Sequence, residues 1–170
     1  MTTEIVPQRN NWDCGLCCLA MAMGIDYDEA LSFLPVAPGV KINTPVPLLE
    51  IVGDTTMPFG LSPAHTARIL LEEGIATGTF GIESYTEAMA GEFTPLELHA
   101  ILNVRTVRAI IFMETATGFH GHAIYWDGVS LIDPARGVLN SDDNRLNHDE
   151  YELIKGAYAV VLIYESPSFK

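Results

Sequence analysis

The chain has 170 residues, 48% of them hydrophobic and 18% charged, a composition that favours one globular domain spanning residues 1–170 over a disordered chain. Nine basic and twenty-two acidic residues give a net charge of −13, which disfavours nucleic acid and anionic lipid as partners. Residues 1–11 lack the pattern of a signal peptide, and the longest apolar runs are too short to cross a bilayer. We therefore expect no membrane span and a cytoplasmic location.

The first half of the chain predicts helices. The run Cys14–Met23 is apolar nearly all round, so we expect a buried central helix that stops at Gly24. A short second helix, beginning at Asp26 or Tyr27 and ending at Leu34, has acidic residues in its first turn, where the helix dipole favours them.

Residues 35–63 are rich in proline and glycine and predict surface loops, with a short helix around 46–52. Capping signals then predict two further helices, since each begins with a hydroxyl side chain followed by proline at the first helical position. In the fourth helix, a glutamate three residues after the threonine completes a capping box. These helices run from Ser62-Pro63 to Gly74, and from Thr94-Pro95-x-Glu97 to about Asn103.

The C-terminal half changes from helical to alternating hydrophobic patterns, which indicate strands. A series of helices followed by an antiparallel sheet is an α+β arrangement, in which we expect the first helix to pack on the sheet. The predicted strands are Arg108–Glu114, Phe119–Trp126, Val129–Asp133 and Ala157–Tyr164.

The dipeptide Asp127-Gly128 lies between two of these strands and predicts a two-residue hairpin turn. In that register His122 lies directly opposite Asp133, close enough for the carboxylate to orient the imidazole. His120 points to the same face, but its partner would be Ala135, beyond a proline, so the register favours His122. An ordinary polar pair at the open end of a hairpin would give the same spacing.

The three cysteines, Cys14, Cys17 and Cys18, lie within five positions and allow four interpretations. Cys14 and Cys17 have the spacing of a redox pair, although no strand precedes them. The same two cysteines with His120 and His122 could bind zinc, although structural zinc sites usually have two well-spaced ligand pairs. All three could also be small apolar side chains in a core helix, which is the interpretation we favour for Cys17 and Cys18.

The fourth interpretation is nucleophilic catalysis by Cys14, which lies where polar loop becomes apolar helix. The positive end of the helix dipole favours the thiolate there, and Gly15 would leave room for a substrate. His122, oriented by Asp133, could act as the base. Gln8 could donate a side-chain N–H to the developing oxyanion, together with the backbone N–H of Cys14.

The run Gln8-x5-Cys14-Gly15, with its apolar helix, resembles the papain-like C39 peptidases, which include the double-glycine leader peptidases that process bacteriocins and their free-standing relatives. The later run HAIYWDGVSLIDPARG, which begins at His122, is similar to the family's histidine-strand-turn-strand-Asp-Pro pattern. The resemblance implies a papain-like fold, with Gln8 as oxyanion donor, Cys14 as nucleophile, His122 as base and Asp133 as orienting acid. It also implies a peptide or protein substrate, for which Gly-rich sequence is an expectation.

A cysteine peptidase acting without metal or cofactor on a peptide or isopeptide bond is thus the leading functional prediction. The same groups could hydrolyse small amides or transfer acyl groups. Two other classes stay open: a binding or inhibitory protein that keeps the fold without turnover, and a thiol–disulfide redox protein that uses Cys14 and Cys17. The acidic surface could attract basic peptides or partners, but acidic surfaces more often serve solubility, which is the interpretation we favour.

Overall fold

The computed structural model describes residues 3–9, 13–34, 61–82, 94–102, 107–114, 121–138 and 156–164. The loops predicted for 35–60, with the short helix around 46–52, therefore lie outside the described residues, as do His120 and Asn103.

All four of the other predicted helices are present in the structure. Their bounds agree with the sequence prediction to within two residues wherever both ends are described. In the part of the chain that the structure describes, no helix combines the length and the apolar character needed to cross a bilayer. The helices are α1 (Cys14–Met23), α2 (Tyr27–Ser32), α4 (Pro63–Glu72) and α5 (Pro95–Leu102).

The helix ends show the local chemistry that the sequence indicates. Gly24 follows α1 in the left-handed conformation, with φ 71°, which glycine adopts without a steric penalty. The Ser62 hydroxyl accepts a hydrogen bond from the His65 N–H at 3.1 Å. Thr94 and Glu97 form the reciprocal capping box: each backbone N–H donates to the other side chain, at 2.8 and 3.2 Å.

The strands form one six-stranded sheet in the order β1-β6-β2-β3-β4-β5, and every pairing between them is antiparallel. Together with the helices, this sheet confirms the α+β class. The strands are β1 (Thr77–Gly81), β2 (Val107–Glu114), β3 (Gly121–Trp126), β4 (Leu131–Asp133), β5 (Gly137–Val138) and β6 (Ala157–Tyr164).

Two strands, β1 and β5, are absent from the sequence prediction. β1 lies between α4 and α5, so the sheet is not confined to the C-terminal half of the chain. Its sequence, TGTFG, has two glycines and no alternating apolar side chains, and it forms an edge of the sheet against β6. Edge strands need no buried face of their own, so the hydrophobic pattern that identifies central strands is missing there.

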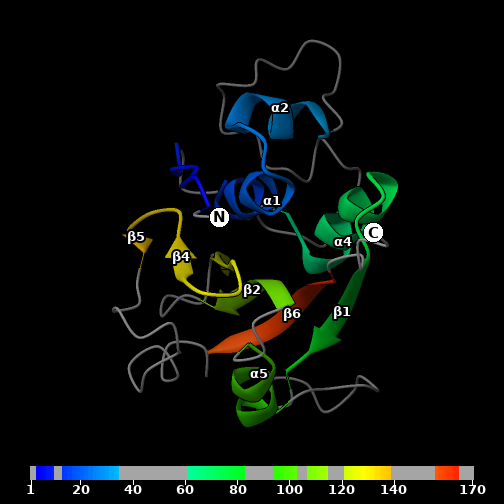
Figure 1. The fold of residues 1–170 in the computed structure, drawn as a ribbon, viewed down its shortest axis with the longest axis vertical. Helices are drawn as coiled ribbons and strands as arrows, with labels where there is room; N and C mark the ends of the chain where they lie inside the picture. The colour runs from blue at the N-terminus through cyan, green and yellow to red at the C-terminus, as the bar shows by residue number, and fades with distance from the viewer. Residues whose placement is uncertain are drawn as a thin grey trace, which may run out of the picture.

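The sheet has a hydrophobic core on each face. On one face, α1, α2 and α4 contribute most of the helical residues, and Phe112, Ala123 and Tyr125 are among the sheet residues that meet them. On the other face, Leu98 and Leu102 of α5 pack with alternate residues of the same strands. Figure 1 shows α1, α2 and α4 on one side of the strands and α5 on the other. The predicted central helix thus lies against the sheet, with α1 packed closely on β3.

The hairpin between β3 and β4 is wider than predicted. Tyr125 pairs with Ile132 and Trp126 with Leu131, so four residues, 127–130, form the connection and the register moves by two positions. The side chain of Asp127 explains the difference, because its Oδ1 accepts hydrogen bonds from the backbone N–H groups of the second and third residues after it, at 2.8 and 2.6 Å. Such an Asx turn competes with the two-residue hairpin turn.

The wider turn removes the predicted direct opposition of His122 and Asp133. Extending the observed register places Ile124, not His122, opposite Asp133. A shift of two positions keeps both side chains on one side of the sheet, whereas a shift of one would separate them. The two residues are therefore diagonal neighbours, at a separation that an imidazole can still span.

Candidate active site

The first helical residue of α1, Cys14, lies against the beginning of β3. Its Sγ is 4.0 Å from the carbonyl oxygen of Gly121, the first residue of that strand. Cys14 is buried, with 6% of its surface exposed, so the surrounding protein limits what can reach the sulfur. Because α1 packs on β3, the fold itself brings the N-terminal end of the helix to the strand that carries His122.

His122 is held from the other side by Asp133. Its Nε2 lies 3.0 Å from Asp133 Oδ1, which also accepts a hydrogen bond from the backbone N–H of Ala135 at 2.8 Å. The Arg136 guanidinium adds a longer contact of 3.8 Å to Oδ2. Asp133 is buried, whereas the His122 side chain is 22% exposed. With Nε2 facing the carboxylate, Nδ1 is the ring nitrogen left for the thiol of Cys14.

The charges of this pair are strongly coupled. Hydrogen bonds to Asp133 and then to Cys14 raise the pKa of His122 to about 9, although burial opposes the protonated form. Burial also opposes the charged form of Asp133, but hydrogen bonds from His122 and the Ala135 N–H outweigh it and lower the pKa of the carboxyl group below its usual value. At neutral pH the imidazole is therefore protonated beside the thiol and the carboxylate.

We predict that the imidazole of His122 titrates near pH 9 in the folded protein, and that Asp133→Asn lowers this midpoint toward the ordinary 6.5, because it removes the largest cause of the shift. Below about pH 6.5 protonated His122 stabilises the fold fully, and this contribution disappears as the pH rises through about 9. Titration of the His122 ring by NMR, with both proteins under identical conditions, measures the shift. A wild-type midpoint near 6.5 would contradict the pairing.

Gln8 is joined to the same region through its backbone. Its N–H donates to the carbonyl oxygen of Pro134 at 3.0 Å, and Pro134 directly follows Asp133. The structure thus brings Cys14, His122 and Asp133 together and places the Gln8 backbone beside the loop that carries Asp133.

The other two cysteines lie deeper in the core. Cys17 and Cys18 are both fully buried, as the packing interpretation expects. Burial, followed by the charges of Asp13 and Cys14, raises the pKa of Cys17 to about 12, and burial raises the pKa of Cys18 well above its usual value. Because the thiolate is the reactive form, neither is chemically suited to attack a substrate.

A metal site was one of the alternatives for the cysteines. The ranges that the structure describes contain no group of three or more His, Cys, Asp or Glu side chains that could hold a metal ion. His120, one of the ligands in that alternative, lies outside these ranges.

Gly15 has a packing role. A Cβ atom at this position would lie 3.2 Å from Cβ of Leu61, closer than most such contacts, so the glycine lets the start of α1 approach the segment that leads into α4. Gly15 is buried against that segment, and its part in substrate access stays a prediction.

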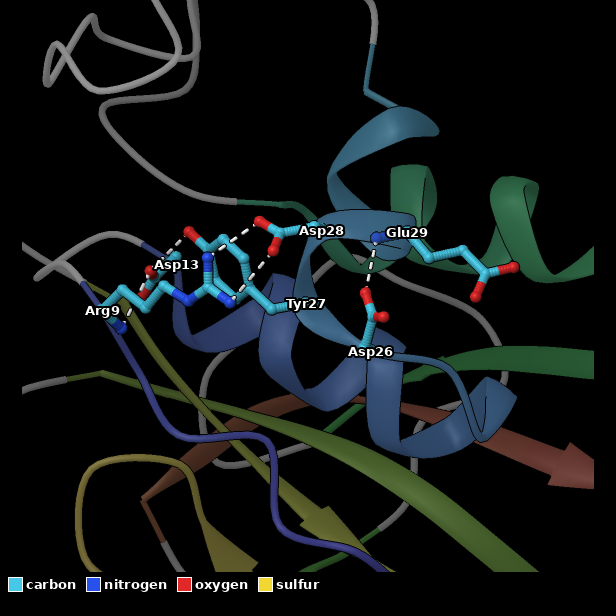
Figure 2. Close-up of polar contacts among 6 residues, drawn as sticks. All are labelled: Arg9, Asp13, Asp26, Tyr27, Asp28 and Glu29. Carbon is cyan, nitrogen blue, oxygen red and sulfur yellow. Dashed lines mark hydrogen bonds and ion pairs between the residues drawn. The ribbon is translucent and has the colours of Figure 1, made fainter.

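Sequence reasoning missed a polar cluster beside Cys14. Asp13, immediately before Cys14, is completely buried and accepts hydrogen bonds from Tyr27 and from the backbone of Arg9. The only sequence signal was an acidic residue directly before an apolar helix, and it did not indicate Tyr27 as the partner. Figure 2 shows the cluster, which extends to Asp28 at the surface.

Neither a scan against protein-family models nor a search of curated proteins finds a match for this chain. The chemical roles of the site residues are therefore inferred from their own geometry and chemistry.

Proposed function

We propose that this protein is a cysteine peptidase with a papain-like, C39-type fold, which hydrolyses a peptide or isopeptide bond through Cys14, His122 and Asp133. The observation that carries the proposal is the placement of His122 between a thiol at a helix N-terminus and a buried carboxylate. A nucleophile, a base in contact with it and a third group that orients the base are the parts that cysteine-dependent acyl transfer requires.

In the first half of the reaction, the Cys14 thiolate attacks the amide carbonyl carbon and forms a C–S bond. The carbonyl electron pair moves to oxygen, and the backbone N–H of Cys14 and the side-chain amide of Gln8 stabilise the oxyanion. When the tetrahedral intermediate collapses, the C–N bond breaks and protonated His122 gives its proton to the leaving amine. The high pKa of His122, about 9, keeps that proton available at neutral pH.

In the second half, a water molecule attacks the thioester while neutral His122 takes its proton. The C–S bond breaks, the carboxylic acid product leaves, and Cys14 is restored. Asp133 holds the ring through Nε2 in both halves, so Nδ1 keeps facing the reacting atoms.

The net charge of −13 supports a basic peptide or protein as the substrate, because a negative field raises the local concentration of positive ligands. The two large cores consist of buried hydrophobic side chains. Within the described residues, the side chains that could carry out chemistry gather at the end of α1. A Gly-rich cleavage sequence is the further expectation that follows from the resemblance to C39 peptidases.

Selective alkylation tests the proposal without knowledge of the substrate. The protein is treated with limiting iodoacetamide near pH 6, and the adduct is mapped by mass spectrometry. Cys14 lies beside the imidazolium of His122, whereas Cys17 and Cys18 are fully buried, so we expect labelling at Cys14 alone. In His122→Ala, which lacks the neighbouring imidazolium, we expect the labelling rate to fall by about tenfold or more.

Cys17 and Cys18 serve as internal controls, because both lie in the same helix and are fully buried. Equal labelling of all three cysteines, unaffected by His122→Ala, would show that Cys14 has no activated thiol and would remove the basis of the proposal. A disulfide between Cys14 and Cys17 that must be reduced before labelling would favour the redox alternative instead.

A further inference from the structure

The side chain of Asp13 closes the loop between Gln8 and Cys14. Its Oδ2 accepts a hydrogen bond from the backbone N–H of Arg9 at 3.1 Å, and its carboxylate is completely buried. Arg9 directly follows Gln8, and Asp13 directly precedes Cys14. This one bond therefore joins the two ends of the loop and limits how far Gln8 can move from Cys14.

Helix α2 fixes the carboxylate in place. The Tyr27 hydroxyl donates to the same Oδ2 at 2.8 Å in a buried contact. The guanidinium of Arg9 lies 3.9 Å above the centre of the Tyr27 ring and pairs with Asp28 at 2.8 Å. In Figure 2, Arg9 covers the tyrosine ring while the hydroxyl points to Asp13. The position of Asp13 is thus set by a residue outside the loop that it closes.

The direction of the Asp13 side chain also affects α1. Asp13 occupies the N-cap position, where an aspartate ordinarily accepts hydrogen bonds from N–H groups of the first helical turn. Here the side chain makes no such bond, and only its backbone carbonyl joins the helix, accepting from the Cys17 N–H at 2.9 Å. The carboxylate therefore does not compete for the N–H groups at the start of the helix, where an oxyanion would bind.

We infer that Asp13 and Tyr27 are positioning residues that set the distance between Gln8 and Cys14, the two donors of the oxyanion site. The inference rests on the proposed function, because an oxyanion forms only if Cys14 attacks a carbonyl group. Donors act on a transition state only when they are placed correctly, and a displacement of about 1 Å can cost roughly a hundredfold in rate. Tyr27, which touches neither substrate nor nucleophile, acts through Asp13.

Two reagents separate this role from a general effect on the nucleophile. A peptidyl ester acylates Cys14 through a tetrahedral oxyanion, whereas iodoacetamide alkylates it by direct displacement and forms no oxyanion. In Tyr27→Phe, which keeps the ring under Arg9 and removes only the hydroxyl, we expect acylation to slow by about ten- to a hundredfold. We expect the iodoacetamide rate to stay within about twofold of the wild type.

Asp28→Asn is the matched control, because it breaks the exposed ion pair with Arg9 and leaves Asp13 untouched. We expect neither rate to change in this variant. Gln8→Ala gives the size of effect expected when a donor is lost altogether, because removal of one oxyanion donor slows the reaction by about a hundred- to a thousandfold. Thermal unfolding of each variant verifies that it folds.

If Tyr27→Phe slows acylation and alkylation equally, the inference is wrong. It is also wrong if Tyr27→Phe acylates at the wild-type rate while Gln8→Ala acylates slowly, although that result would leave the proposed function intact. If the wild type itself forms no acyl adduct, the proposed function fails and the inference fails with it. Should Tyr27→Phe not fold, Asp13→Asn decides in its place: slowed acylation with normal alkylation supports the inference, and any other result contradicts it.

Discussion

Cys14→Ala is expected to abolish hydrolysis, with kcat falling on the order of 10⁶-fold to the level that binding alone provides. The substitution removes the only atom that forms a covalent bond with the substrate in the proposed reaction, so no thioester can accumulate. The measurement is turnover of a mixed library of fluorogenic peptides, with and without basic side chains. The fold should survive, because the change deletes a single sulfur at the start of α1.

Cys17→Ala is the control variant for this prediction. Cys17 lies one helical turn further along α1 and is fully buried, so its loss tests the effect of removing a core sulfur without touching the nucleophile. We expect turnover to be retained, with a modest loss of stability. Loss of activity in Cys17→Ala as well as in Cys14→Ala would favour a dithiol mechanism over acyl transfer.

His122→Ala is expected to have the second-largest effect, a decrease in kcat of about 10⁴-fold or more. The variant lacks both the proton donor for the leaving amine and the cation beside the thiol. Because Cys14 and His122 act as a unit, the double variant Cys14→Ala/His122→Ala should be no slower than Cys14→Ala alone. Steady-state kinetics of the two single variants and the double variant measure this lack of additivity.

Asp133→Asn completes the series. The amide keeps an oxygen that can accept from His122 Nε2 but loses the charge that holds the ring protonated. We expect a smaller decrease in kcat than in His122→Ala. For the preceding prediction, a Cys14→Ala/His122→Ala double variant much slower than Cys14→Ala would show that His122 works independently of the thiol. That result would contradict the proposed mechanism.

The sequence predicted the pairing of His122 with Asp133 through a register that the structure corrects. The turn is four residues wide because the side chain of Asp127 caps it, a choice between two local hydrogen-bond patterns that the Asp-Gly dipeptide does not decide. Side chains alternate along a strand with a period of two. The error of two positions therefore kept the side chains of His122 and Asp133 on one side of the sheet, and the predicted pairing still forms.

Helices were predicted well because capping residues and apolar periodicity are local. The glycine that ends α1 and the serine that starts α4 both act within one turn of their own position. β1 was missed for the opposite reason: its partner is β6, more than seventy residues later, and its own sequence has little alternation. Contacts of that range are decided by the packing of the whole chain.

The polar cluster around Asp13 was beyond sequence reasoning in the same way. The contact between Asp13 and Tyr27 depends on how α2 folds back over α1, which spacing alone does not determine. Asp13 lies at the N-cap position of α1, yet its side chain makes no capping hydrogen bond. The burial of this carboxylate beside Cys14 became visible only with the structure.

In the proposed reaction Cys14 accepts an acyl group with the help of His122, and trapping that acyl group is the decisive experiment. The protein is mixed with a peptidyl p-nitrophenyl ester, quenched in acid, and its intact mass is measured before the adduct is mapped by fragmentation. We expect one acyl group per chain, on Cys14. Neutral hydroxylamine should release it, as it releases a thioester, and it should form much more slowly in His122→Ala. No adduct, or an adduct spread over Cys17, Cys18 and lysines, would contradict it.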